Sequence, residues 1–566
     1  MEKRHLLFLF LLLVNSAYSQ NHSIIPCPVS YEIGNEGDFQ LSNSTIITIN
    51  KNDKELFRLA GLMGESLNLR NSQNNDFIVN EADKDLIKKY NNVIQLTLSA
   101  VSNPNDEGYN LTVKKNKITL KASSYRGLFY GIQSFIQLIP TEFTLNNTGF
   151  RYDDIKNKVQ EEQVTQITEY YIKGCKIVDY PRFSYRGMHL DVCRHFFPID
   201  FIKKYIDLMA FYKMNNFHWH LTDDQGWRIE IKKFPLLTQK GAWRSSTTIG
   251  RNNGQDSIPY GGFYTQDEAR EIVNYAAARY VNVIPEIELP GHALAALSAY
   301  PQYSCNGGPF EVWTWWGVTD DIFCAGKEQT FSFLEVILTE VMDIFPSHYI
   351  HIGGDEAPKI RWESCPWCQQ RMRDKGLKDE LELQSYFVQR IEKFINKRGR
   401  EIIGWDEILE GGLAGGATIM SWRGTSGGIT AAGKKHNVIM TPGSPCYLDH
   451  YQGNPENEPL AFGGNNTLSK VYSFNPIPHE LPKRQHKYII GAQGNVWTEY
   501  ILSPEHVEYM AYPRAIALAE VNWSPQKNRE FKHFMNRLEH HFIWLDMLKV
   551  NYRRPSLNEE ASLRYL

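Results

Sequence analysis

The stretch Tyr349-Ile-His-Ile-Gly-Gly-Asp355-Glu356 joins a short apolar run, two glycines and two adjacent carboxylates. The apolar run predicts a buried strand, and the glycines predict that the strand ends there in a turn. Burial and mutual repulsion favour the protonated form of one of the two acids at neutral pH. A protonated acid beside an ionised one is suited to proton transfer. A plainer interpretation is that both acids only cap a helix N-terminus.

The same pattern, an apolar run that ends in polar or aromatic residues, recurs along the chain after residue 183. We expect strands at 185–191, 216–222, 281–289, 349–354, 400–405, 417–422, 437–442 and 487–496. Amphipathic helical patterns lie between several of them, at 266–279, 329–345 and 380–397. Strand-then-helix units repeated in this way predict an α/β fold, a (β/α)8 TIM barrel, rather than an open sheet.

A chain of 566 residues is too long for one ordinary domain. Residues 20–182 mix short alternating strands, such as 46–49 and 93–98, with an amphipathic helix at 125–138. They predict a small N-terminal α+β domain, whose polar stretch 151–168 we expect to be a loop or linker. The barrel is expected to span 183–545, and residues 546–566 are expected to form a C-terminal tail.

The first 19 residues have the pattern of a signal peptide. Lys3 and Arg4 precede an apolar run from Leu6 to Val14, and Ala17-Tyr-Ser19 offers small residues at the usual cleavage spacing. Because the run is too short to span a membrane, we expect an exported protein, periplasmic or secreted, without a membrane anchor. The formal net charge of −3 gives no reason to expect nucleic acid as a partner.

Cysteines are the second chemical feature of the sequence. An exported chain can form disulfides, and Cys305 and Cys324, which flank a Gly- and Trp-rich loop, are the pair most suited to form one. Cys365-Pro-Trp-Cys368 is compatible with a redox motif or with half of a zinc site. Because no second cysteine pair follows at zinc spacing, we expect a local disulfide or two free thiols there.

Each predicted strand of the barrel ends in a carboxylate, a cation or an aromatic residue. Such strands end at one face, so these side chains should line a common polar cup with aromatic walls. Among them, in chain order, are the candidates Arg194, Asp223, Glu288, His292, Asp355, Glu356, Trp405, Trp422, Tyr447, Asp449, Trp497 and Glu499. A cup of this kind suits a sugar, because pyranose C–H faces pack on aromatic rings and charged side chains form strong hydrogen bonds to hydroxyls.

Six motifs occur in order along the predicted barrel. They are Arg186-Gly-Met-His-Leu-Asp-Val-Cys-Arg194-His-Phe-Phe, His220-Leu-Thr-Asp-Asp-Gln-Gly-Trp-Arg228, Pro290-Gly-His292, His351-Ile-Gly-Gly-Asp-Glu356, Gly404-Trp-Asp-Glu407 and Trp497-Thr-Glu499. Together they resemble glycoside hydrolase family 20, the β-N-acetylhexosaminidases, over about 183 to 525, and the preceding domain resembles that family's usual N-terminal domain. The sequence departs from the pattern at Glu288, where many members carry Asp.

The resemblance implies an exo-acting enzyme that removes terminal N-acetylglucosamine or N-acetylgalactosamine from glycans or chitooligosaccharides. It implies a retaining, substrate-assisted mechanism, in which the 2-acetamido oxygen of the substrate attacks the anomeric carbon and forms an oxazolinium ion. By resemblance, Glu356 is the general acid and then the base. Asp355 then holds the acetamido N–H, and Tyr447 holds the acetamido oxygen.

The remaining candidates divide by resemblance into three groups. Arg194, Asp449 and Glu499 would bind the hydroxyls of the terminal sugar. Trp405, Trp422 and Trp497 would form the pocket walls. Asp223, His292 and Glu288 would support the acid pair. The resemblance implies a carbohydrate substrate as partner, no cofactor and no metal ligand, and it leaves the choice between the two sugars open.

Two other classes of function stay open at this point. His218-Trp-His220 at a strand end resembles the paired histidines of metal-dependent TIM-barrel hydrolases, and His292 with nearby acids would complete such a site. The two histidines instead share one face of a strand, so they also suit the barrel interior. A non-catalytic sugar-binding protein would keep the tryptophan walls but would not need Glu356.

Overall fold

The computed structural model describes residues 22–41, 45–67, 77–103, 105–141, 170–412 and 415–555. The predicted signal peptide, the predicted linker at 151–168 and the end of the predicted tail lie outside these ranges. Within them, no helix combines the length and the apolar character needed to cross a membrane. The chain forms two compact units. One contains the described residues up to Tyr180 together with His533–Met547, and the other contains Pro181–Lys532 and the residues after Met547.

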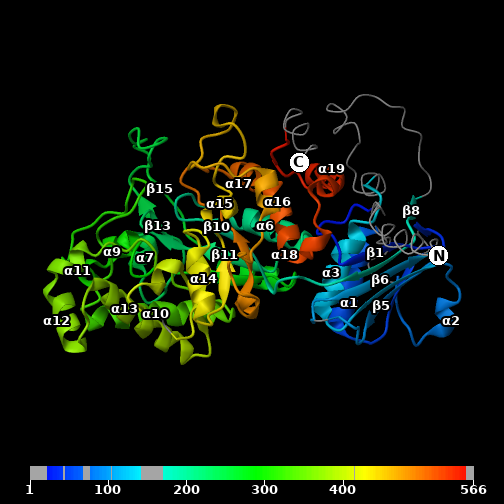
Figure 1. Ribbon diagram of the computed structural model, residues 1–566, viewed down its shortest axis with the longest axis horizontal. Coiled ribbons are helices and arrows are strands. Elements are labelled where there is room, and N and C mark those ends of the chain that lie inside the picture. Colours follow the sequence, from blue (N-terminus) through cyan, green and yellow to red (C-terminus); the bar gives the residue numbers. More distant parts are fainter. Residues whose placement is uncertain are drawn as a thin grey trace, which may run out of the picture. The chain divides into compact units, whose positions relative to one another are not determined.

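Eight parallel strands of the second unit close into a barrel (Figure 1). Their bounds are β10 (Tyr185–Asp191), β11 (Asn216–His220), β16 (Asn282–Glu286), β17 (Tyr349–His351), β18 (Glu401–Trp405), β19 (Thr418–Ser421), β20 (Val438–Met440) and β21 (Ile489–Gly494). The last strand pairs with the first, so that Tyr185 lies opposite Gly491. The predicted α/β class, a TIM barrel preceded by a small α+β domain, is confirmed.

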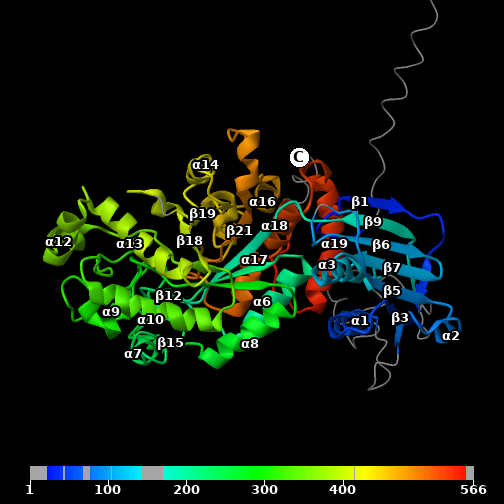
Figure 2. The ribbon, with the colours of Figure 1, turned by 90° about the horizontal axis from the view of Figure 1, so that it is seen from below.

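Helices follow the strands and cover the outside of the barrel. The longer ones are α6 (Ile199–Phe211), α8 (Gln266–Ala277), α10 (Glu328–Ile344), α12 (Pro366–Lys375), α13 (Glu380–Asn396), α14 (Ser426–Gly433), α17 (Pro504–Ala511) and α18 (Arg514–Trp523). The shorter ones are α7 (Leu236–Gln239), α9 (Leu294–Ala299), α11 (Ile360–Ser364), α15 (Gly443–Cys446) and α16 (Leu468–Ser473). Figure 2 shows α10 between α8 and α13, both of which it contacts.

Sequence patterns explain both the ends and the packing of these helices. α8 begins at a capping box, in which Thr265 and Glu268 each accept a backbone N–H of the other. α13 begins at Asp379, whose side chain accepts the N–H of Glu382, and it buries Leu383 and Phe387 as its periodicity predicts. The barrel interior is filled by large side chains, among them Tyr185, Ile284, Ile403, Trp405, Met420 and Ile439.

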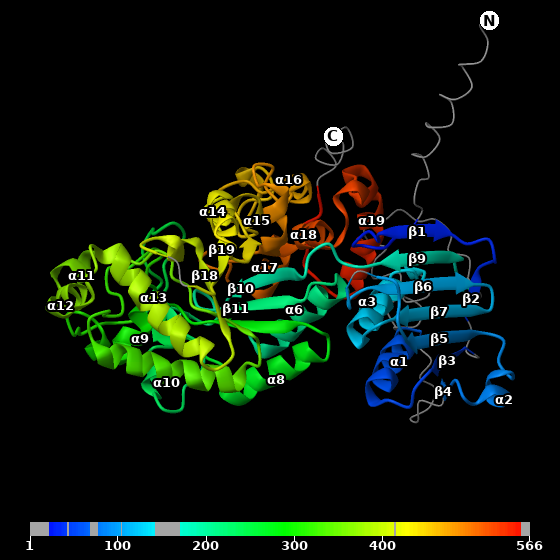
Figure 3. The same ribbon diagram turned by 60° about the horizontal axis from the view of Figure 1, so that its bottom comes forward.

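The first unit is built on a seven-stranded sheet in the order β1-β9-β6-β7-β5-β3-β4. Its strands are β1 (Ser30–Ile33), β3 (Ile46–Ile49), β4 (Ile78–Asn80), β5 (Val93–Leu98), β6 (Tyr109–Lys114), β7 (Lys117–Ala122) and β9 (Cys175–Asp179). β2 (Phe39–Leu41) pairs with β8 (Tyr170–Ile172), and a short α2 covers Lys84–Ile87. Helices α1 (Lys54–Ser66) and α3 (Tyr125–Ile136) lie side by side on one face of the sheet (Figure 3).

The C-terminal helix differs from the expected domain division. α19 (Phe531–Met547) lies almost wholly in the expected barrel domain, 183–545, yet His533–Met547 group with the N-terminal unit. The apolar face of α19 buries Phe534, Leu538 and Phe542. Periodicity predicts that a helix has such a face, but it does not say which unit the face packs on.

The predicted Cys305–Cys324 disulfide is wrong, because all eight cysteines are free thiols. The loop between Cys305 and Cys324 folds so that both thiols approach the first turn of α12, where Cys365 and Cys368 lie. The Sγ atoms of Cys305 and Cys368 are 3.8 Å apart, and those of Cys324 and Cys365 are 3.7 Å apart. The two thiols of Cys365-Pro-Trp-Cys368 are likewise not joined to each other.

Candidate active site

The residues predicted at the strand ends line one open cavity, whose empty space, with the adjoining open solvent included, is about 570 Å³. The lining residues are Arg194, Asp223, Glu288, His292, Asp355, Glu356, Trp405, Trp422, Tyr447, Asp449, Phe462, Trp497 and Glu499. The structure therefore brings together all twelve sequence-predicted residues and adds Phe462. Every barrel strand contributes through its C-terminal end or the loop that follows it, which is where TIM barrels place their sites.

The adjacent acids lie on a sharp turn after β17. Gly353 and Gly354 adopt positive φ angles of 65° and 94°, which side-chain-bearing residues rarely adopt. Glu356 and His292 also have positive φ angles, 43° and 45°. Non-glycine residues in this region are strained, and such strain is concentrated at functional sites. The turn points Asp355 into the protein, where it is 8% exposed, whereas Glu356 remains more open to the cavity.

His292 joins the two acids to a buried carboxylate pair. Its Nδ1 lies 3.2 Å from both Asp223 Oδ1 and Asp224 Oδ2, and its Nε2 lies 3.5 Å from Glu356 Oε2 and 3.7 Å from Asp355 Oδ2. Burial disfavours the imidazolium, but Asp223 and Asp224 outweigh it and raise the pKa of His292 well above its usual value. A cationic His292 can donate on one side to Asp223 and Asp224 and on the other to Glu356.

The pKa values of the two acids are shifted in opposite directions. Burial, with added repulsion from Glu286 and Glu356, raises the pKa of Asp355 to about 7. The hydrogen bond from His292 lowers the pKa of Glu356 despite its partial burial. In the free protein the proton of this pair therefore favours Asp355. The family resemblance implies that Glu356 is the acid, so the proton must move to Glu356 if that role is correct.

A second group of charges surrounds Arg194. Its guanidinium lies 2.9 Å from Asp223 Oδ2, 3.2 Å from Asp191 Oδ2 and 3.7 Å from Glu499 Oε1. Asp449 is 3% exposed, and neither of its carboxylate oxygens has a hydrogen-bond partner among the described residues. Burial and repulsion from Glu499 raise the pKa of Asp449 well above its usual value. Buried oxygens without partners need donors, which sugar hydroxyls supply.

Aromatic rings form the walls of the cavity. Trp422 and Tyr447 are nearly parallel, with centroids 6.2 Å apart and an interplanar angle of 17°. Trp405 and Trp497 lie 5.9 Å apart at 45°. Trp405 is held in place because its Nε1 donates to Glu286 Oε1 at 2.9 Å. These four rings supply most of the apolar part of the cavity lining.

Glu286 organises the histidines that raised the alternative of a metal site. His218 Nε2 lies 3.0 Å from Glu286 Oε2, His351 Nδ1 lies 2.7 Å from Glu286 Oε1, and His220 Nδ1 also contacts this carboxylate. His220 Nε2 reaches Asp223 at 3.0 Å. His218 and His220 thus belong to a buried polar network that reaches the cavity lining at Asp223, which also contacts His292 and Arg194.

Glu288, the departure from the family pattern, fills the space under the turn. A Cβ at Gly353 would lie 1.6 Å from Glu288 Oε2, so this glycine leaves free the space that the Glu288 carboxylate fills. Burial and repulsion from Asp355 raise the pKa of Glu288 well above its usual value. A neutral Glu288 would reduce the repulsion that opposes ionisation of Asp355.

Sequence reasoning missed several residues that shape the site. Phe462 comes from a loop with no recognisable pattern. Glu407 accepts the Nε1–H of Trp422 at 2.9 Å, and burial next to Asp355 raises its pKa to about 9. Gln225 accepts from Arg194 Nε at 2.9 Å. Glu407 and Gln225 lie inside recognised motifs, and Glu286 lies inside the predicted strand 281–289. Their positions along the chain were therefore available from the sequence, but their contacts were not.

Comparison with known proteins agrees with this geometry. The profile of "Glycosyl hydrolase family 20, catalytic domain" matches residues 183–526, and that of "Glycosyl hydrolase family 20, domain 2" matches residues 21–180. A Beta-hexosaminidase of Porphyromonas gingivalis is 45% identical over 95% of this chain, and one of Vibrio furnissii is 37% identical over 73%. The chain spans 65% of the length of each of these two relatives.

Solved structures of similar fold come from the same family. The GH20 beta-N-acetylhexosaminidase of Streptomyces coelicolor A3(2) has a TM-score of 0.77 and 28% identity, covering 95% of this chain and 98% of its own. The GH20 exo beta-N-acetylglucosaminidase of Vibrio harveyi, solved with N-acetylglucosamine, has a TM-score of 0.76 and 28% identity, covering 95% of this chain and 79% of its own. With a catalytic-domain match over more than half of its length, the chain belongs to glycosyl hydrolase family 20.

Proposed function

We propose that the chain is an exo-acting β-N-acetylhexosaminidase that cleaves terminal N-acetylhexosamine residues with retention of configuration. The observation that carries the proposal is the position of Asp355 beside Glu356 and His292. Asp355 is buried, and its Oδ1 has no hydrogen-bond partner among the described residues. An amide N–H of the substrate is the kind of donor that would satisfy this oxygen.

In the first step, the acetamido carbonyl oxygen of the substrate forms a bond to the anomeric carbon while the bond to the leaving oxygen breaks. Glu356 gives its proton to that leaving oxygen. Asp355 accepts the acetamido N–H and stabilises the positive charge of the oxazolinium ion as it grows. The aromatic walls hold the reacting amide in place, which makes the attack effectively intramolecular.

In the second step, a water molecule attacks the anomeric carbon and the bond to the acetamido oxygen breaks. Glu356, now ionised, accepts the proton of that water. The two inversions together retain the anomeric configuration. The nearby cation His292 favours the ionised form of Glu356 between the two steps.

Substrate binding is what moves the proton from Asp355 to Glu356. A hydrogen bond from the acetamido N–H favours ionised Asp355 and lowers its pKa, whereas burial of Glu356 under the leaving group raises the pKa of Glu356. The free protein holds the pair in the opposite order. Two carboxyl groups with interchangeable pKa values suit an acid that must later act as a base.

Arg194, Asp449 and Glu499 are the proposed binders of the terminal sugar's hydroxyls. All three lie on the wall of the same cavity and carry charge or unpartnered oxygens. The proposal covers glycans and chitooligosaccharides with a non-reducing N-acetylglucosamine or N-acetylgalactosamine. The relatives' names and the bound sugar of the Vibrio harveyi structure support this class of substrate.

A panel of aryl glycosides tests the proposal. The purified chain should hydrolyse aryl N-acetylglucosaminide, N-acetylgalactosaminide or both, and it should leave the glucoside and galactoside almost untouched. Asp355→Asn, prepared in parallel, controls for contaminating glycosidases. Failure to turn over either acetamido sugar, or equal rates on the plain glucoside, would refute the assigned activity.

We propose further that the protein is exported, on the evidence of the N-terminal 19 residues alone. Mass determination of the mature N-terminus after expression in a bacterial host, together with fractionation into periplasm and medium, tests this. A cytoplasmic chain that keeps residue 1 would contradict it.

A further inference from the structure

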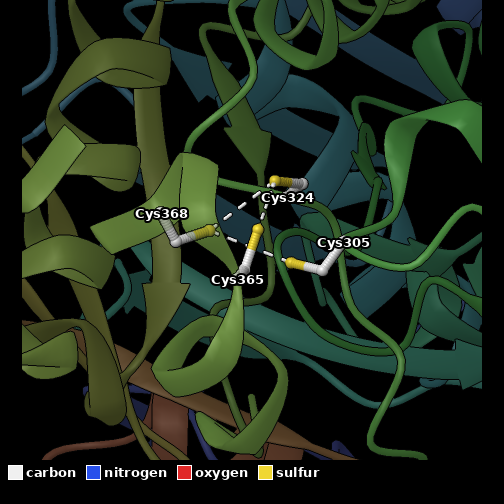
Figure 4. Close-up of side chains that lie close together, drawn as sticks. All are labelled: Cys305, Cys324, Cys365 and Cys368. Carbon is white, nitrogen blue, oxygen red and sulfur yellow. Dashed lines mark hydrogen bonds between the residues drawn. The ribbon is translucent and has the colours of Figure 1, made fainter. Parts of the chain in front are cut away.

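Four cysteines that are separated in the sequence converge beside the barrel. Cys305 follows the short 3₁₀ helix Pro301–Tyr303, Cys324 ends the loop that follows it, and Cys365 and Cys368 flank the first turn of α12. Figure 4 shows their four sulfur atoms pointing toward one another. None of them lines the cavity described above.

The spacing of the sulfur atoms matches a metal-thiolate tetrahedron. The Sγ–Sγ distances are 3.8 Å for Cys305 and Cys368, 3.7 Å for Cys324 and Cys365, and 3.6 Å for Cys324 and Cys368. All four sulfurs lie within 4.8 Å of one another. Sulfurs bound tetrahedrally to zinc at about 2.3 Å are about 3.8 Å apart, whereas disulfide sulfurs are separated by only about 2.05 Å.

We propose that Cys305, Cys324, Cys365 and Cys368 bind a structural zinc ion. Four protein ligands leave no open coordination position, and such closed sites stabilise folds rather than catalyse reactions. Four thiolates in tetrahedral geometry select zinc over the hard cations, which prefer oxygen. Cys324, Cys365 and Cys368 are at most 3% exposed, so the site excludes water from most of its surface.

The chain around the cluster is shaped for this approach. A Cβ at Gly326 would lie 2.1 Å from the carbonyl carbon of Trp367 and 2.3 Å from the backbone nitrogen of Cys368, so only glycine allows the two segments to come so close. The indole of Trp362 is fully buried, and its Nε1 donates to the carbonyl of Phe323 at 3.0 Å. These contacts bring Cys324 to the first turn of α12.

The proposed zinc site anchors a loop that reaches the active site. Between Cys305 and Cys324, the carbonyl of Trp315 accepts from Gln225 Nε2 at 3.0 Å, and Thr319 Oγ1 donates to Asp224 Oδ1 at 3.3 Å. Gln225 in turn contacts Arg194, and Asp224 contacts His292. Loss of the metal should therefore loosen residues that position the catalytic groups without touching the substrate.

Two disulfides are the rival state of the same cysteines, because an oxidising compartment favours them. Two measurements on the full-length protein, purified without chelator or reductant, distinguish a bound metal from two disulfides. Elemental analysis should find about one zinc per chain. Alkylation after denaturation in chelator, followed by mass spectrometry, should find all four cysteines as thiols. Absence of zinc with oxidised cysteines would overturn the proposal, and iron in place of zinc would overturn the choice of metal.

Variants localise the metal. Cys324→Ser and Cys365→Ser should each lose bound zinc, whereas Cys175→Ser, which changes a buried thiol of the N-terminal unit, should keep it. Should the serine variants not fold, cobalt exchanged into the unaltered protein provides an independent readout. It should give the intense visible absorption of a tetrahedral tetrathiolate, and a spectrum of octahedral oxygen ligation would contradict the site.

Discussion

At the scale of single residues, Asp355 is the group whose role separates this mechanism from that of a conventional glycosidase. Its contribution should be larger in the transition state than in the ground state, because the oxazolinium charge grows next to it. Asp355→Asn keeps the shape and removes the charge. We expect kcat to fall by about two to four orders of magnitude, roughly 3–5 kcal/mol, with KM little changed. Steady-state kinetics on an aryl N-acetylglucosaminide measures this, and a loss confined to KM would contradict the role.

The same substitution should stabilise the fold at neutral pH. The pKa of Asp355 is about 7 in the folded chain and near 3.9 when unfolded, so folding favours the protonated acid. Its contribution to the free energy of unfolding therefore falls as pH rises from about 4 to about 7, and it stays low above that pH. Asparagine carries no charge to bury. The gain in the free energy of unfolding is at most a few kcal/mol, because the pKa is shifted by about three units and one unit corresponds to about 1.4 kcal/mol.

Thermal denaturation of the two proteins across this pH range checks the direction in which the stability difference changes with pH. The melting temperatures of Asp355→Asn and the unaltered chain should be close near pH 4 and should diverge, with the variant higher, up to about pH 7. A variant that is less stable at pH 8 would show that ionised Asp355 is favourably held in the free protein.

The role of Glu356 as the general acid is tested by varying the basicity of the leaving group. Glu356→Gln cannot protonate the departing oxygen, so substrates with basic leaving groups should lose most of their rate. Activated aryl groups, which leave without a proton, should lose much less. Plotting log kcat/KM against leaving-group pKa should therefore give a steeper negative slope for the variant. Parallel lines would remove Glu356 from the acid role.

At the scale of elements, the turn after β17 depends on Gly353 because of Glu288. Gly353→Ala places a methyl group where the Glu288 carboxylate lies and imposes a positive φ on alanine. We expect kcat/KM to fall at least about tenfold, an effect of about 1.4 kcal/mol or more on the transition state. Glu288→Asp withdraws the carboxylate by one methylene, so the double variant should regain part of the loss.

Gly399 provides the matched control. It has a similar φ of 71°, but nothing lies within 4 Å of a Cβ placed there. Gly399→Ala should therefore cost about 1 kcal/mol of stability and leave kcat/KM unchanged. If Gly353→Ala behaved like Gly399→Ala, or if Glu288→Asp gave no rescue, the contact between the turn and Glu288 would not matter for catalysis.

The barrel strands were predictable because each is an apolar run followed by a break. The predicted 349–354 shortens to β17 (Tyr349–His351), because Gly353 and Gly354 turn the backbone out of the sheet. Residues at strand ends were predictable as a set for the same reason, since parallel strands place their ends together. Which of Asp355 and Glu356 has the higher pKa was not predictable, because it depends on where His292 lies in space.

The cysteine cluster shows what spacing along the chain cannot reveal. Cys324 and Cys365 belong to different βα units, and α10 with β17 separates them in sequence. Their thiols meet only because the fold brings the segment from Cys324 to Gly326 against the first turn of α12. Zinc motifs that are recognised by sequence have two ligand pairs at short spacing, and this set has one pair and two single cysteines.

At the scale of the whole molecule, the chain forms two compact units. The barrel unit contains every residue of the cavity and of the cysteine cluster. The N-terminal unit also includes His533–Met547, which lie near the C-terminus of the sequence. The barrel was predictable from repetition, because eight similar units specify one closed sheet. The unit to which α19 belongs was not predictable, because an amphipathic face does not identify the surface on which it packs.

The central claim is that the substrate's own amide is the nucleophile in this barrel. The most direct test is a series of aryl glycosides with the same leaving group and with N-acetyl, fluoroacetyl, difluoroacetyl and trifluoroacetyl groups. Each fluorine withdraws electrons from the amide oxygen and weakens its attack. We predict that kcat/KM falls stepwise by at least about a thousandfold in total, roughly 4 kcal/mol. Rates that stay level across the series would contradict the account, because an enzyme carboxylate would then be the nucleophile.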